Sequence, residues 1–122
     1  MPCRHAMKIN HALLTVGLML ASSVPGQDVM QLVSECEDCH GPGGVSSDAD
    51  VPSLAGKSVN YIREILGQFY RYERHCRTTT FRHGDRAKTP MNMCRVAQDL
   101  SDDDKQAVAE YFARVGSESA RE

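Results

Sequence analysis

The pentapeptide CEDCH, Cys36 to His40, constrains this chain more than any other stretch of its sequence. Two cysteines stand about one helical turn apart, so that a helix presents both sulfurs on one face, and a histidine follows directly. The chain around it has a thin core, with no Trp and only three Phe in 122 residues. A domain of this size is marginal unless something is added to its core. A large apolar group, bound covalently, would supply what is missing.

C-x-x-C-H is the attachment signature for c-type haem. The thiols of Cys36 and Cys39 can each add to a vinyl group on one edge of the porphyrin, and His40 then gives the iron its proximal nitrogen ligand. A redox C-x-x-C would need a βαβ context, which the sequence lacks. A zinc site would need a second ligand pair, and His75-Cys76 lies on no recognisable knuckle. The motif therefore predicts one covalent haem.

Residues 1–26 read as a signal peptide. A positively charged start is followed by ten apolar residues, Ala12 to Ala21, and then by small residues. An uncleaved anchor is the alternative, but a spanning helix wants roughly 20 apolar residues. We therefore expect residues 27–122 to form one domain in the periplasm, without stable membrane insertion.

Formal charge is distributed unevenly along the predicted mature chain. Six acids and one base lie in residues 28–62, three acids and eight bases in residues 63–95, and seven acids and three bases in residues 96–122, which gives −5, +5 and −4. The net charge is negative and the basic residues are not paired with a stacking platform, so nothing here indicates a nucleic-acid binder.

Helical periodicity predicts an all-α domain with loops between three helices, and no convincing strand. The predicted helices span residues 28–40, 58–72 and 101–116. Their starting residues are Asp28, Ser58 and Ser101, the last in a Ser-x-x-Asp box with Asp104. Gly41 to Gly43 should stop the first helix, and Gly116 fits the C′ position of the last.

The sixth iron ligand is open on residue chemistry alone. Methionine sulfur would raise the reduction potential relative to histidine. Two methionines in a loop after Thr-Pro, just before an N-capped helix, are better placed than the others. The candidates are Met91, Met93, His75, His83, Cys76 and Cys94.

From Gln27 to Gly116 the chain resembles the class I c-type cytochromes, in particular small periplasmic ones from bacteria. The resemblance rests on CEDCHGPGG, on VPSLAGKSVNYI and on the ending MCRVAQDLSDDDKQAVAEYFA. It implies the class I fold, in which helices pack around one covalent haem. It also implies that Met93, seven residues before Leu100, is the sixth ligand, with Met91 as the second choice. The proximal histidine would donate to the carbonyl of Pro52.

The same resemblance implies a packing arrangement. Residues 29–33 would pack across residues 108–112, and three apolar side chains would line the haem: Leu54, Ile62 and Leu66. Ordinary core packing is the alternative role for all of them. The basic middle segment, residues 71–94, is similar to a subgroup associated with sulfur oxidation, including cytochrome subunits of flavocytochrome c sulfide dehydrogenases.

Two functions fit these features. The first is an electron carrier with His/Met-ligated iron, acting alone or docked on a redox partner such as a flavoprotein dehydrogenase. The basic residues from Arg71 to Arg95 would then steer an acidic partner, unless they are simply a solvated face. The alternative is a sulfur-compound oxidoreductase that uses Cys94 or Cys76 at or near the iron.

The cysteine count discriminates between these functions. Cys3 leaves with the leader and two cysteines carry haem, so Cys76 and Cys94 remain in an oxidising compartment. We therefore predict a disulfide between them, which would close a loop and contribute about 3 kcal/mol in the chain-entropy model. The competing interpretation leaves both thiols free and places Cys94 at the iron.

Overall fold

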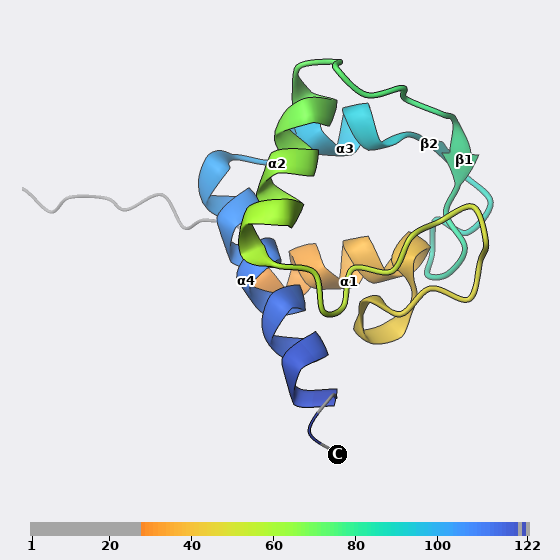
Figure 1. Ribbon diagram of the computed structural model, residues 1–122. Coiled ribbons are helices and arrows are strands. Elements are labelled where there is room, and N and C mark those ends of the chain that lie inside the picture. The colour runs from red at the N-terminus through yellow and green to blue at the C-terminus, as the bar shows by residue number, and fades with distance from the viewer. Residues whose placement is uncertain (1–27, 120, 122) are drawn as a thin grey trace, which may run out of the picture.

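The computed structural model describes residues 28–119 and residue 121. Within them the fold is all-α apart from one pair of two-residue strands, which confirms the predicted fold class (Figure 1). The predicted signal peptide lies outside the described residues. None of the described helices is long and apolar enough to cross a membrane. The elements are α1 (Val29–His40), a 3₁₀ turn η1 (Pro42–Gly44), α2 (Val59–Tyr70), β1 (Thr79–Thr80), β2 (Pro90–Met91), α3 (Met93–Asp99) and α4 (Asp102–Ser119).

The three predicted helices begin where their caps indicated. The Asp28 carboxylate accepts from the Met30 N–H at 3.0 Å, and the Ser58 hydroxyl accepts from the Tyr61 N–H at 3.1 Å. Ser101 and Asp104 form a reciprocal box: each side chain accepts from the other residue's backbone N–H, at 3.1 and 2.9 Å. These bonds satisfy N–H groups that a helix start leaves without partners.

Besides the short strand pair and an α2 that ends at Tyr70 instead of residue 72, two features differ from the expectation. Gly116 was expected just after the last helix, but α4 continues to Ser119 and Gly116 lies inside it. A Cβ at Gly116 would overlap the backbone of Gly56, so this glycine allows the loop before α2 to approach the helix. The second is α3, a helix of seven residues where a loop was expected, which starts because the Asn92 side chain accepts from the Arg95 N–H at 2.9 Å.

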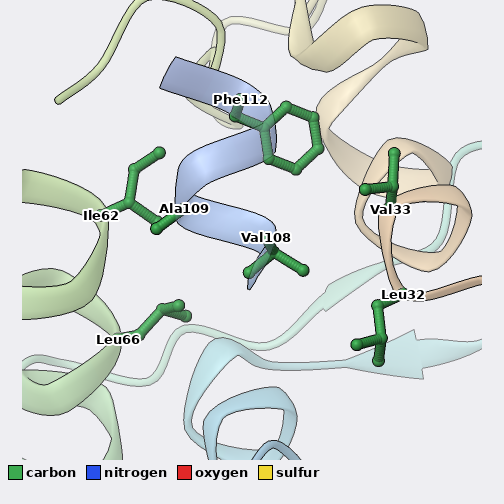
Figure 2. Close-up of a cluster of buried hydrophobic side chains, with 7 residues drawn as sticks. All are labelled: Leu32, Val33, Ile62, Leu66, Val108, Ala109 and Phe112. Carbon is green, nitrogen blue, oxygen red and sulfur yellow. The ribbon is translucent and has the colours of Figure 1, made fainter. Parts of the chain in front are cut away.

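The core is a cluster contributed by three helices (Figure 2). It packs α1 against α4, as the resemblance implied for residues 29–33 and 108–112, and places α2 on the other side of α4. Its members are Leu32 and Val33 from α1, Ile62 and Leu66 from α2, and Val108, Ala109 and Phe112 from α4.

Three sets of contacts hold the segment between α2 and α3 in place. A disulfide joins Cys76 to Cys94, with a Cα–Cα distance of 5.6 Å, as the cysteine count predicted. Beyond it, β1 pairs antiparallel with β2. Further along, the backbone N–H groups of Arg82 and His83 donate to the Asp38 carbonyl, at 2.8 and 2.9 Å. The long basic segment is thus fixed to the end of α1 that carries CEDCH.

Candidate functional site

A cleft of about 640 Å³ lies beside the core, and its lining is mostly apolar. Residues of α1, α2 and α3 line it, and Figure 1 shows these three helices around one side of the molecule, with α1 and α3 apart and α2 between them. Five of the seven residues in the core cluster also line it: Leu32, Ile62, Leu66, Val108 and Phe112. The core of this protein is therefore one wall of a cleft.

The His40 imidazole lies in the cleft wall and is buried. Its Nδ1 is 2.6 Å from the carbonyl oxygen of Pro52. A carbonyl can only accept, so Nδ1 carries the proton and Nε2 keeps its lone pair. Burial lowers the pKa of His40, although the bond to Pro52 opposes that shift. A neutral imidazole whose free nitrogen is Nε2 is the form that coordinates a metal.

Cys36 and Cys39 also line the cleft, and neither is in a disulfide. Burial, together with the neighbouring carboxylates of Glu35 and Glu37, raises the pKa of Cys36 to about 12. Burial also raises the pKa of Cys39. Redox C-x-x-C pairs have the opposite property, a depressed thiol pKa. The described residues contain no group of three or more His, Cys, Asp or Glu that could hold a metal ion.

Met91 and Met93 both line the cleft, from the end of β2 and the first residue of α3. Met93 packs against the core cluster as well. Of the other sixth-ligand candidates, His75 lines the cleft, whereas His83, Cys76 and Cys94 are not among its lining residues.

The remaining predicted haem contacts are also on the cleft wall: Pro52, Leu54, Ile62 and Leu66. Two buried side chains, Val51 and Phe81, were not predicted. Both come from loops, where no helical stripe could mark them. Phe81 is covered by the Arg86 guanidinium, which lies 4.2 Å from the ring centroid.

These residues fit a haem. Two thiols one helical turn apart, an imidazole protonated on Nδ1 and a thioether line one mostly apolar cleft. Five of the seven core residues also line this cleft, so their packing is complete only when a large group fills it. Cationic side chains also line the cleft. They are Lys57, Arg74, Arg77 and Arg86.

The chain belongs to the cytochrome c family, whose model matches residues 23–115. Proteins of this class carry covalently bound haem c and act as electron carriers rather than enzymes, and the Cys36, Cys39 and His40 pattern fits one haem. The chain is also 40% identical, over 85 residues, to the thiosulfate dehydrogenase electron acceptor of Stutzerimonas stutzeri (strain A1501). That match covers 69% of this chain and 34% of the relative, so the chain corresponds to about a third of the relative's length.

Proposed function

We propose that this protein carries single electrons in the periplasm through a haem iron ligated by His40 and Met93, with Cys36 and Cys39 as the thioether positions. The observation that carries the proposal is the hydrogen bond from His40 Nδ1 to the Pro52 carbonyl. It leaves the lone pair of Nε2 free to bind iron, in a cleft that Met93 also lines. When bound, the haem supplies an iron that changes oxidation state by one electron.

The chain's own residues would fix the two iron ligands and surround the ring, so that little rearranges when the iron gains or loses an electron. The Pro52 carbonyl fixes the tautomer and orientation of His40, and the mostly apolar cleft wall would surround the ring. Leu54, Ile62 and Leu66 would contact the faces of the ring. Two fixed ligands leave no coordination position open for a substrate, which suits a carrier better than an enzyme.

We further propose that the donor is a thiosulfate-oxidising dehydrogenase. The relative from Stutzerimonas stutzeri is an electron acceptor of thiosulfate dehydrogenase, which supports this choice over a flavoprotein sulfide dehydrogenase. The test is to mix ferric holoprotein with a thiosulfate dehydrogenase and thiosulfate, and to follow haem reduction by absorbance. We expect rapid, thiosulfate-dependent reduction. Reduction only by a flavoprotein sulfide dehydrogenase with sulfide would overturn this choice of donor and leave the carrier role intact.

The alternative, a sulfur oxidoreductase that works through Cys76 or Cys94, is not favoured. Both sulfurs are consumed in the disulfide, and neither cysteine is among the residues that line the cleft.

The basic segment contributes a smaller docking surface than its composition indicates. Most of the arginines from Arg71 to Arg95 have a carboxylate partner close by: Arg71 pairs with Glu73 and Glu64, Arg82 with Asp50, Arg86 with Glu35 and Asp38, and Arg95 with Asp99. Among the described residues of this segment, Arg74 and Arg77 make no ion pair and line the cleft, with exposed His75 between them. We propose that these three residues face the acidic surface of the donor.

Charge reversal tests this surface. Arg74→Glu with Arg77→Glu should slow haem reduction by the donor about tenfold at low ionic strength, because electrostatic steering changes association rates by that order. The difference should vanish at high salt. The matched control is Arg63→Glu with Lys88→Glu, which changes the net charge equally at two positions outside the cleft lining. Equal slowing in both pairs would mean that net charge alone, and not this surface, determines the rate.

A further inference from the structure

Met93 lies at the start of a short helix, a position that is poorly fixed for a side chain that is to stay bound to the iron. It is the first residue of α3, which has only seven residues. A helix this short is not stable by itself, since nucleation costs more than a few hydrogen bonds return. Its end residues fray first. Something outside the helix must therefore fix Met93 in the cleft.

The disulfide is attached directly beside it. Cys94 follows Met93, is 2% exposed, and is bonded to Cys76. Both sulfur atoms lie near the carbonyl oxygen of Arg74, at 3.5 Å for Cys76 and 3.9 Å for Cys94. Arg74 also contacts α2, through a hydrogen bond to Gln68 and a guanidinium placed over the Phe69 ring. The start of α3 is thereby tied to the end of α2, which is itself part of the cleft.

The other restraints on Met93 are weaker. The Asn92 side chain caps α3, and the preceding strand β2 has two residues paired with two in β1. At the far end of α3, the Gln98 amide donates to the Tyr70 carbonyl at 2.7 Å. None of these is covalent, and the last is about one and a half turns away from Met93.

We propose that Cys76 and Cys94 are positioning residues for the sixth ligand: their disulfide holds the Met93 side chain at the iron and thereby keeps the haem closed to outside ligands. The inference rests on the proposed function, in which Met93 is that ligand. A cysteine pair with a merely structural role would add to stability without changing how often Met93 leaves the cleft.

The test uses the holoprotein matured in the periplasm, with Cys76→Ala and Cys94→Ala combined. The measurements are the rate at which ferric haem binds cyanide, the methionine–iron absorption band and the haem reduction potential. Cyanide must wait for the sixth position to open, so we expect its binding rate to rise by about tenfold or more, which corresponds to a loss of about 1.4 kcal/mol in ligand retention. The band should weaken and the potential should fall.

The control is Asp28→Ala, which removes the cap of α1 and should lower the melting temperature with no change in the cyanide rate. A double-alanine variant that is less stable but binds cyanide at the wild-type rate would overturn the inference. If that variant does not mature, the disulfide of the wild-type holoprotein is reduced with a water-soluble phosphine and its thiols are alkylated. The haem iron is then returned to the ferric state, and the same comparison is made.

Met93→Ala separates the two proposals. A variant that keeps the band would overturn Met93 ligation, and with it the positioning role. A variant that loses the band, together with an unchanged cyanide rate in the double-alanine protein, would overturn the positioning role alone.

Discussion

At the scale of single residues, the site depends on one hydrogen bond whose direction is determined by chemistry. The Pro52 carbonyl has no proton to give, so it assigns the proton of His40 to Nδ1 and leaves Nε2 free. Burial lowers the pKa of the same ring and keeps it neutral near pH 7. The side chain is thus in the state a metal ligand needs before any metal is present, and this reduces the rearrangement that binding requires.

The sixth ligand gives the sharpest prediction at this scale. Met93→Ala should abolish the methionine–iron band and lower the reduction potential, because a thioether stabilises the reduced iron. Absorption spectroscopy and a redox titration check both effects. Met91→Ala is the control, since Met91 lines the same cleft two residues earlier and should be dispensable. Loss of the band only in the Met91 variant would transfer the ligand role to that residue.

At the scale of elements, the contact between α4 and the loop before α2 depends on a glycine. A Cβ at Gly116 would overlap the Gly56 backbone, and no rotamer change can relieve a clash with backbone. Gly116→Ala should therefore destabilise the protein by about 1–3 kcal/mol, as overpacking commonly does. Denaturant unfolding of the holoprotein measures this change.

Gly67→Ala is the matched control, because Gly67 also lies inside a helix. The three atoms nearest to a Cβ there all belong to the movable end of the Arg71 side chain. Replacing a glycine within a helix should then stabilise the protein by about 0.5–1 kcal/mol. Two substitutions of one kind should change stability in opposite directions. Equal effects would show that the approach of the loop to α4 does not depend on Gly116.

Prediction from the sequence succeeded for elements with a long periodic stripe and a cap. Ser58 and Ser101 each start a helix because their side chains can satisfy backbone N–H groups within the next three residues. The same reasoning missed α3, because seven residues are too few for a stripe to stand out. It also placed Gly116 after α4, since a glycine that ends a helix and one that admits a neighbouring loop look alike until the neighbour is known.

The candidate site was more predictable than the fold around it. Cys36, Cys39 and His40 are close in sequence, so their chemistry follows from spacing alone. By contrast, Phe81 and Val51 are buried by tertiary contacts of loops, for which no local pattern exists. The sequence also could not show that only a few cations of the basic segment lack an ion-pair partner. The carboxylates that pair with Arg82 and Arg86 come from residues more than thirty positions away.

At the scale of the whole molecule, the core and the cofactor cleft are one structure. Most of the core cluster faces the cleft, so without haem these side chains would border a cavity of about 640 Å³ instead of a packed interior. Leaving the apolar side chains of this wall against water costs an amount comparable with the ~5–15 kcal/mol that stabilises a typical domain, since full burial of one large apolar side chain contributes about 1.5–3 kcal/mol. The disulfide restrains the chain but does not fill that space.

Removing the attachment cysteines should therefore remove the fold. Cys36→Ala combined with Cys39→Ala prevents both thioether bonds while leaving His40, Met93 and the Cys76–Cys94 disulfide in place. We expect the purified variant, freed of any loosely bound haem, to lose most of its helical circular dichroism and to show no cooperative thermal transition. The control is the wild-type holoprotein with its disulfide reduced and alkylated, which should keep a cooperative transition at a lower temperature because its cleft stays filled. A haem-free variant that melted cooperatively with wild-type helicity would show that the seven-residue core is sufficient without its cofactor.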